Sequence, residues 1–251
     1  MNDLEGSRLF RAWRTMLEML SDRGYNVDAR LLAYNEADFE ALCPTREAMT
    51  LHVHHNERRD RQLRVIFVGR ETVGPAAVLD GKVRKASVLP LMRRLGNGTQ
   101  TRGIFVFADD LSITPAATTV MTAINEESPG MLQWFAEEEL VVNLGRRERG
   151  YGTRYRSPFP AGVSSGDLGR LYEVDPVARY YNAQQGDVVH IVRRSETSGL
   201  TVSYKRCVPN DEIRVLTLDE KTGMPSIVSY KVGITGEIAK FNDADAAETG
   251  P

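Results

Sequence analysis

Residues 175–208 constrain the fold of this chain more than any other part of its sequence. The Asp175 carboxylate can accept hydrogen bonds from the unpaired N–H groups at a helix start, and Pro176 suits the first helical position. Gly186 precedes the apolar run DVVHIVR, and Gly199 precedes LTVSYKRCV. The pattern therefore predicts a short helix followed by two small strands. It contains no motif for a nucleophile, a metal cluster or a phosphate-binding loop.

This segment resembles the C-terminal module of the fifth common subunit of the eukaryotic nuclear RNA polymerases, which has a counterpart in archaeal RNA polymerase. That family shares a DPVAR(Y/F) helix start, a GxVxxIxRxSxTxG centre and a final strand with tyrosine. The matching residues here are Asp175, Pro176, Val177, Ala178, Arg179, Tyr180, Gly186, Val188, Ile191, Arg193, Ser195, Thr197, Gly199 and Tyr204. The resemblance implies a small mixed α+β module that docks on the largest polymerase subunit, near the sixth common subunit. All the matching residues except Val188 and Ile191 form the expected assembly interface.

The N-terminal part resembles the jaw domain of the same family. The line RAWRTMLEMLSDRGY matches its first helix, GIFVFADDLSITPAATTV matches a strand and a helix start, and WFAEEELVVNL matches a later helix and strand. The resemblance implies an α/β jaw with a restriction-endonuclease-like fold beside downstream duplex DNA. Weak, sequence-independent DNA contact is expected at two places. These are the helix start Thr114, Pro115, Ala116 and Ala117, where the family's serine is lost, and a predicted hairpin loop with Arg58, Arg59, Arg61 and Arg64.

The chain departs from the family in two places. Its linker is shorter and lacks the family's Val-Pro-x-His segment, and the chain continues past the tyrosine strand where family members generally end. We therefore expect a divergent member of the family, or a paralogue with a specialised role. Because the archaeal counterpart lacks the jaw, the resemblance implies a eukaryotic nuclear enzyme, or a virus that captured one. The predicted parts are a jaw domain (1–144), a linker (145–170), the assembly module (171–208) and an extension (209–251) with three short strands and a disordered end.

Alternation of helix and strand patterns in the N-terminal part favours an α/β layer. An apolar stripe around Trp13 predicts a helix that begins at Ser7 and ends before Gly24, and Asn35 predicts the cap of the next helix. Strands are predicted over residues 49–55, 62–68, 103–108 and 140–144. Helices are predicted over residues 82–95, from Thr114 onward, and over residues 131–136.

Composition limits the possible partners. The chain has 251 residues and a formal net charge of −2, so it is not a polycation and any DNA contact needs a local basic patch. Cys43 and Cys207 lie far apart and fit a reducing compartment as buried or half-buried thiols. We find no signal-peptide pattern and no apolar run of membrane-spanning length. With the resemblance, we expect a nuclear protein without cofactors, membrane contact or homo-oligomers.

Three clusters offer other chemistry. His52 and His54 would share one face of a strand as a possible metal pair, but no cysteine or carboxylate accompanies them at ligand spacing. Asp109 and Asp110 end a predicted buried strand, yet a metal-dependent nuclease needs an acid on a neighbouring strand, and residues 62–68 contain none. A solvated linker is favoured over nucleic-acid contact for a basic-aromatic run. That run comprises Arg146, Arg147, Arg149, Tyr151, Arg154, Tyr155 and Arg156.

We therefore expect a non-catalytic structural subunit of a DNA-directed RNA polymerase. It would anchor on the largest subunit and form part of the jaw around downstream DNA, while the large subunits and their magnesium ions carry out phosphodiester chemistry. Arg179 and Arg193 would meet carboxylates of a partner, or else lie in water. A polymerase-associated regulatory adaptor and a metal-dependent nuclease are the alternative functions.

Overall fold

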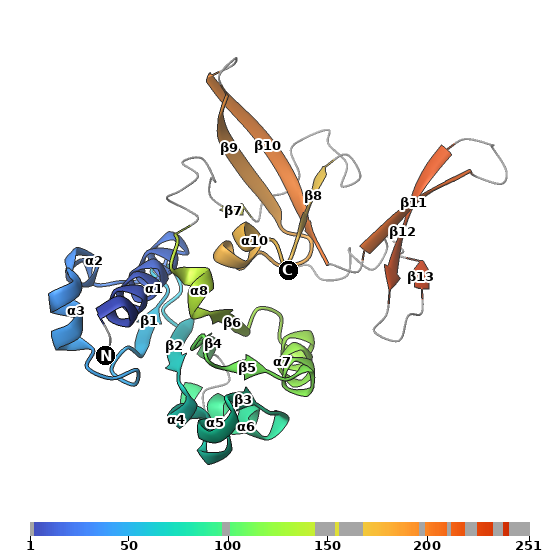
Figure 1. The fold of residues 1–251 in the computed structure, drawn as a ribbon. Coiled ribbons are helices and arrows are strands. Elements are labelled where there is room, and N and C mark those ends of the chain that lie inside the picture. The colour runs from blue at the N-terminus through green and yellow to red at the C-terminus, as the bar shows by residue number, and fades with distance from the viewer. Residues whose placement is uncertain are drawn as a thin grey trace. The chain divides into compact units, whose positions relative to one another are not determined.

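The computed structural model describes residues 3–96, 101–143, 154–155, 168–195, 199–209, 212–218, 225–232 and 238–240. The chain divides into two compact units, Met1–Arg147 and Glu148–Pro251. Both units contain helices and strands, so the expected mixed α/β content is confirmed (Figure 1). Among the described residues, no helix combines the length and apolar character needed to cross a membrane.

A four-stranded sheet forms the centre of the N-terminal unit, in the order β1-β2-β4-β6. Its strands are β1 (Leu51–His54), β2 (Gln62–Val68), β4 (Thr101–Phe107) and β6 (Leu132–Ala136). Only β1 runs antiparallel to its neighbour, while β2, β4 and β6 are mutually parallel. Parallel neighbours need long crossover connections, and helices occupy them here. The crossover helices are α4 (Arg70–Val73), α5 (Pro75–Asp80), α6 (Lys85–Leu95) and α7 (Pro115–Glu127).

Helices cover both faces of this sheet (Figure 1). On one face, Ile66 and Phe105 belong to a buried apolar cluster with Leu91 of α6 and Met121 of α7. The opposite face packs against the N-terminal helices, where Trp13 is 1% exposed. These helices are α1 (Asp3–Asp22), α2 (Ala29–Ala33) and α3 (Glu36–Leu42). A separate two-stranded parallel sheet joins β3 (Lys82–Val83) to β5 (Ser112–Ile113).

Several predicted ends of helices are confirmed, because local hydrogen bonds fix them. Asn35 caps α3 with a capping box, in which its side chain accepts from the Asp38 N–H and the Asp38 side chain accepts from the Asn35 N–H. Thr114 caps α7 and Pro115 follows at its first position. Gly24 follows α1 with φ of +82°, a conformation in which glycine is free of Cβ strain.

Other predictions are wrong. Ser7 lies inside α1, which begins at Asp3 with acidic residues that favour a helix N-terminus. The expected helix over residues 131–136 is strand β6, because its five residues pair in register with β4. The expected strand over residues 140–144 is no strand in its described part. Instead, three glutamates favour the start of the short helix α8 (Glu137–Leu140). The expected helix over residues 82–95 is also wrong in its first part, where residues 82–83 form strand β3. The helix α6 begins at Lys85 and continues through Pro90 to Leu95.

The C-terminal unit contains a second four-stranded sheet, in the order β7-β9-β10-β8. Its strands are β7 (Arg154–Tyr155), β8 (Gly169–Tyr172), β9 (Val188–Ser195) and β10 (Gly199–Val208). The predicted order of a helix and two strands is confirmed, since α10 (Pro176–Tyr181) precedes the antiparallel hairpin β9–β10. Strand β8 was not predicted and pairs parallel with β10. Ala178 of α10 packs with Val189, Ile191 and Cys207 of the sheet.

The predicted extension forms strands as expected. They are β11 (Glu212–Leu218), β12 (Pro225–Val232) and β13 (Ile238–Lys240), joined as an antiparallel sheet. The predicted disordered end, from residue 243 onward, lies outside the described residues.

Candidate functional site

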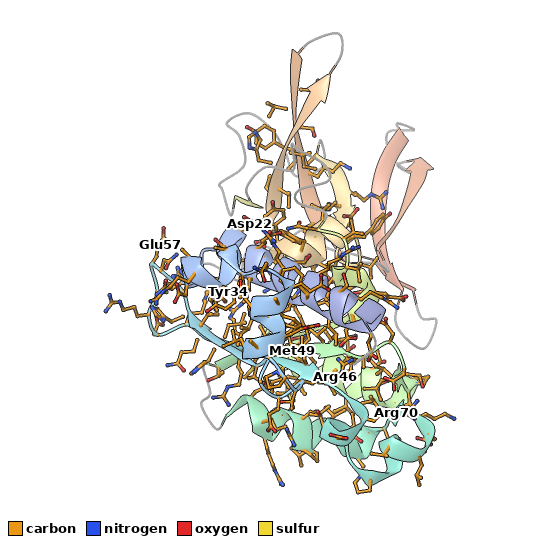
Figure 2. All side chains as sticks on the ribbon, turned by 60° about the vertical axis from the view of Figure 1, so that its left-hand side comes forward. Asp22, Tyr34, Arg46, Met49, Glu57 and Arg70 are labelled. Carbon is orange, nitrogen blue, oxygen red and sulfur yellow. The ribbon has the colours of Figure 1, made fainter. Side chains whose placement is uncertain are left out.

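Open α/β sheets bind ligands at the carboxyl ends of their parallel strands, so the ends of β2, β4 and β6 form a candidate ligand site. Asp109 and Asp110 follow β4 and Glu137 follows β6, and an arginine is bonded to each of these three carboxylates. Arg46 binds Glu137 through two hydrogen bonds, one of which joins Nη2 to Oε2 at 3.2 Å. Arg70 Nε donates to Asp110 Oδ2 at 2.6 Å, and Arg8 pairs with Asp109. Figure 2 labels Arg46 and Arg70.

Burial strengthens the central pair of this cluster. Glu137 is 7% exposed, and the Arg46 side chain is 25% exposed. Burial lowers the pKa of the Arg46 guanidinium, and the charges of Asp110, Glu5 and Asp109 oppose that effect. An arginine in such a site still carries its charge, since its ordinary pKa is far above neutrality.

This cluster therefore gives the nuclease alternative no support. Asp109 Oδ1 also accepts a hydrogen bond from the Glu138 backbone N–H at 3.0 Å. Across the part of the chain that the structure describes, no three His, Cys, Asp or Glu side chains come together as possible metal ligands. The paired carboxylates instead tie α1 and α4 to the end of β4, and the loop before β1 to the start of α8.

The β1–β2 hairpin carries the predicted arginine loop. Arg58 and Arg59 are exposed in this loop and Arg61 is half-buried, whereas Arg64 belongs to β2 rather than to the loop. Arg64 Nη1 donates to the backbone oxygen of Arg94 at 2.7 Å, which ties β2 to the end of α6. Glu57, labelled in Figure 2, lies in the same loop.

His55 fixes the base of this loop. Its Nδ1 accepts the backbone N–H of Glu57 at 3.2 Å, and its ring meets Tyr25 edge-on with centroids 5.4 Å apart. Burial lowers the pKa of His55, and the positive charge of Arg61 lowers it further. The neutral imidazole is therefore the form that this fold favours.

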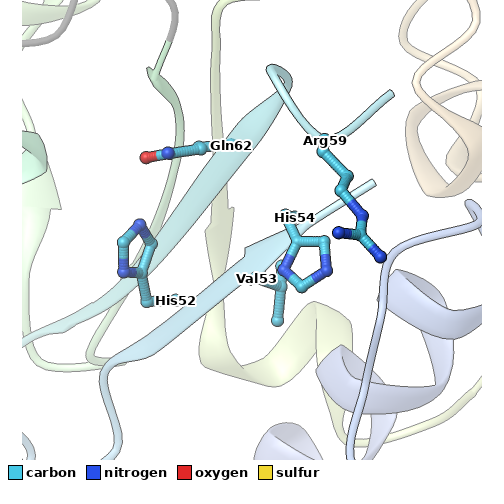
Figure 3. Close-up of a pocket in the computed structure, with 5 residues that line it drawn as sticks. All are labelled: His52, Val53, His54, Arg59 and Gln62. Atoms are coloured by element: carbon cyan, nitrogen blue, oxygen red, sulfur yellow. The ribbon is translucent and has the colours of Figure 1, made fainter. Parts of the chain in front are cut away.

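An open pocket of about 310 Å³ lies beside the hairpin (Figure 3). Its lining residues are His52, Val53, His54, Arg59 and Gln62. The expected placement of the histidines is confirmed, because His52 and His54 are both exposed at alternate positions of β1. The Asn26 amide nitrogen lies 3.4 Å from His54 Nε2. The described residues supply no third ligand of the kind that a metal pair would need.

The helix start at Thr114 is the second place where DNA contact is predicted. Thr114 Oγ1 donates to the Val83 backbone oxygen at 2.9 Å and accepts the Ala117 N–H at 3.4 Å. Ala117 is fully buried, whereas Pro115 and Ala116 are exposed. Loss of the family's serine therefore leaves the helix cap intact. Contact with DNA at this helix start stays a prediction.

Many of the predicted assembly residues stabilise the fold of the module itself. Asp175 Oδ1 accepts the Val177 N–H at 2.8 Å, and Pro176 follows as the first residue of α10. Gly186 and Gly199 adopt φ of +85° and +74°, which a side chain would strain. Buried members of the set form the apolar side of α10, namely Val177, Ala178 and Tyr180. Whether these residues also contact a partner stays a prediction.

The outer face of the module is partly apolar and exposed. Tyr204 is 41% exposed and stacks on His190, with ring centroids 5.0 Å apart. Val202 on the same strand face is 50% exposed, and Tyr172 is 40% exposed. Of these residues, the sequence predicted only Tyr204 at an interface. The segment that forms β8 is too short to be recognised as a strand, so Tyr172 was not predicted.

Comparison with known proteins identifies the family. Residues 3–79 match the N-terminal domain of RNA polymerase Rpb5, and residues 161–208 match its C-terminal domain. The chain is 31% identical to the DNA-directed RNA polymerases I, II, and III subunit rpabc1 of Dictyostelium discoideum, over 80% of this chain and 98% of that protein. The chain belongs to the Rpb5 family. It is also 28% identical to subunit RPABC1 of Caenorhabditis elegans, over 82% of this chain and 99% of that protein.

The Rpb5 match bears directly on the module. Its C-terminal domain match begins before β8 and ends at Val208, so it includes β8, α10, β9 and β10. Arg193 and Ser195 lie in β9, whereas Thr197 lies outside the described residues. Most of the basic-aromatic run also lies outside them, namely Arg146, Arg147, Arg149, Tyr151 and Arg156, while Arg154 and Tyr155 form β7.

Proposed function

We propose that this chain is a non-catalytic structural subunit of a DNA-directed RNA polymerase. The observation that carries the proposal is the match of residues 3–79 and 161–208 to the N-terminal and C-terminal domains of Rpb5. The paired carboxylates at the carboxyl edge of the sheet support a non-catalytic part, because a hydrolytic metal site needs carboxylates open to the metal. The phosphodiester chemistry belongs to other subunits of the enzyme.

The N-terminal unit acts as a jaw beside downstream duplex DNA. Its central sheet, with three parallel strands, one antiparallel edge strand and helices on both faces, is consistent with a restriction-endonuclease-like fold. Exposed arginines of the β1–β2 loop, Arg58 and Arg59, supply positive charge for weak contact with phosphates. The exposed start of α7 supplies a second contact, through backbone N–H groups of a 13-residue helix.

The C-terminal module anchors the chain on the largest subunit, near the sixth common subunit. Tyr204, Val202 and Tyr172 expose apolar surface on one face of its sheet, and aromatic side chains are enriched where proteins contact one another. Most of the matching motif residues stabilise α10 and the turns. They therefore support the fold that holds this face in place, and do not themselves form the face. The exposed aromatic face is therefore the part of the module that meets the partner.

The expected location is the nucleus. The relatives in Dictyostelium discoideum and Caenorhabditis elegans are named as subunits of polymerases I, II and III, which are nuclear enzymes in eukaryotes. The free cysteines Cys43 and Cys207 are both buried, which fits a reducing compartment. Burial also raises the pKa of Cys43, so its thiol stays protonated and unreactive.

Recovery of the polymerase on tagged variants tests the assembly role. We expect Val202→Ser/Tyr204→Ser to lose most of the co-purifying polymerase at moderately high salt, because the exposed apolar contact is removed. Tyr34→Ser, which changes a half-buried tyrosine of the N-terminal unit, is the matched control and should retain it. Equal recovery on both variants would contradict docking through this face. A trace, salt-labile association of the wild type would favour a regulatory adaptor.

A further inference from the structure

The pocket beside the β1–β2 hairpin has an unusual lining. Four of its five residues carry side chains that can donate hydrogen bonds, and none of the five is acidic. Two are histidines of β1, one is Gln62 at the start of β2, and one is Arg59 from the loop between these strands. In Figure 3 the Arg59 guanidinium extends from the loop toward the His54 ring. Side chains from three successive segments therefore converge on one hollow.

Strand register explains why these side chains converge. His54 lies opposite Gln62 and His52 lies opposite Arg64, so all four residues project from the same face of the sheet. Farther along β2, Ile66 and Val68 on this face are buried in the cluster that includes α6 and α7. The helices thus cover the apolar part of the face and leave its polar corner open to solvent.

The charges around the pocket favour an anion over a metal cation. Two histidines alone would suit a transition metal, but the guanidinium of Arg59 repels a cation and cannot be deprotonated at neutral pH. Arg64 adds a second positive charge on the same face, opposite His52. The loop acids Glu57 and Asp60 offset part of this charge, yet neither lines the pocket.

We propose that this pocket binds a phosphate group of the duplex DNA backbone. Arg59 forms the ion pair with the phosphate, and the two histidines and Gln62 donate hydrogen bonds to its oxygens. The proposal rests on the proposed jaw function and deepens it, since it distinguishes Arg59 from the other arginines of the loop. The same phosphate chemistry is offered by free inorganic phosphate, so the experiment separates these two sources.

The test uses the full chain and two charge-matched variants. Arg59→Gln removes the guanidinium that lines the pocket, while Arg58→Gln removes an equal charge from the neighbouring position, which does not line it. Binding of a fluorescent 20-base-pair duplex is measured by anisotropy at several low salt concentrations. We expect Arg59→Gln to weaken binding roughly tenfold and to reduce the salt slope by about 1, and Arg58→Gln to weaken binding much less.

A second measurement removes the hydrogen-bond donors and identifies the ligand. We expect His52→Leu/His54→Leu to weaken duplex binding, with circular dichroism unchanged because both residues are exposed. Ring resonances of His52 and His54 should shift in NMR spectra on addition of the duplex. A shift with inorganic phosphate at a similar concentration, and none with the duplex, would contradict the choice of DNA as the source.

The outcomes separate this inference from the proposed function. Equal weakening by Arg58→Gln and Arg59→Gln would leave DNA contact at the hairpin intact but overturn the pocket as its site. No binding of the duplex by the wild-type chain at low salt would also overturn the pocket site. Failure of the tagged chain to recover polymerase would contradict the proposed function, whatever the duplex shows.

Discussion

A single methyl group at Gly103 should disturb the packing of α6 on the central sheet. A Cβ added there would lie 2.2 Å from Leu95 Cδ1, 2.9 Å from Cδ2 and 3.1 Å from Cγ. Ordinary contacts between carbon atoms are about 3.5–4.0 Å, so Leu95 would have to retreat by more than about 1 Å. Leu95 is 3% exposed and belongs to the cluster between α6 and the sheet. It therefore cannot move without moving neighbours.

We expect Gly103→Ala to reduce the free energy of unfolding by about 2 kcal/mol, within the range for an overpacked core. For a domain of this size, that loss lowers the melting temperature by about 4–8 °C. Gly103 pairs with Arg64 across β2 and β4, so displacement of α6 should also weaken the hydrogen bond from Arg64 to the Arg94 backbone oxygen. Urea unfolding followed by tryptophan fluorescence measures the loss.

Two further variants make the reasoning refutable. Leu95→Ala combined with Gly103→Ala should be less destabilised than the sum of the two single changes, by about 1 kcal/mol or more, because the new methyl group occupies part of the cavity. Gly6→Ala is the control: its Cβ would lie 3.3 Å from the mobile Oε1 of Glu40, and alanine in a helix gains about 0.5–1 kcal/mol. Gly103→Ala within about 0.5 kcal/mol of wild type would refute the packing argument.

Two other perturbations test the hairpin and the carboxyl edge of the sheet. Because the fold lowers the pKa of His55, the unfolded chain binds this proton at a higher pH than the folded chain does. The contribution of His55 to stability is therefore intact above the ordinary pKa of about 6.5, and it declines as the pH falls from there toward the pKa of the folded state. The free energy of unfolding in urea should therefore fall less between pH 7.5 and pH 5.5 in His55→Gln than in the wild type. An equal fall in both proteins would count against this view. Glu137→Ala should cost about 3 kcal/mol in the same assay, because it leaves the half-buried Arg46 without its main partner. Asp80→Ala, which breaks an exposed ion pair, should change stability far less, and equal losses would argue against burial as the cause.

The features predicted well from the sequence are those that a few neighbouring residues determine. The caps at Asn35, Thr114 and Asp175 each depend on one side chain and a backbone N–H two or three residues away. The strand over residues 62–68 was also predictable, since its apolar run is long and rich in β-branched residues. Such signals survive whatever the rest of the chain does.

Predictions failed where distant pairing decides the structure. Strand β6 has five residues whose apolar pattern fits a helix turn equally well, and only its register with β4 makes it a strand. Strand β8 is shorter still, and it exists because β10 offers a free edge. A periodic pattern of so few residues does not specify its partner.

The same limit applies to the candidate sites. The shared face of His52 and His54 followed from strand alternation, but the approach of Arg59 depends on the loop and could not be predicted. Likewise, Asp109 and Asp110 were expected at the end of a buried strand. Their arginine partners, Arg8 and Arg70, come from segments remote in sequence.

The central claim is that this chain is a stoichiometric polymerase subunit. The most direct test is purification of the tagged full chain from nuclear extract at moderately high salt, followed by intact-complex mass spectrometry. Our account predicts one copy of the chain per complex together with one pair of large polymerase subunits. Recovery of the chain alone, or with only a trace of polymerase, would contradict it.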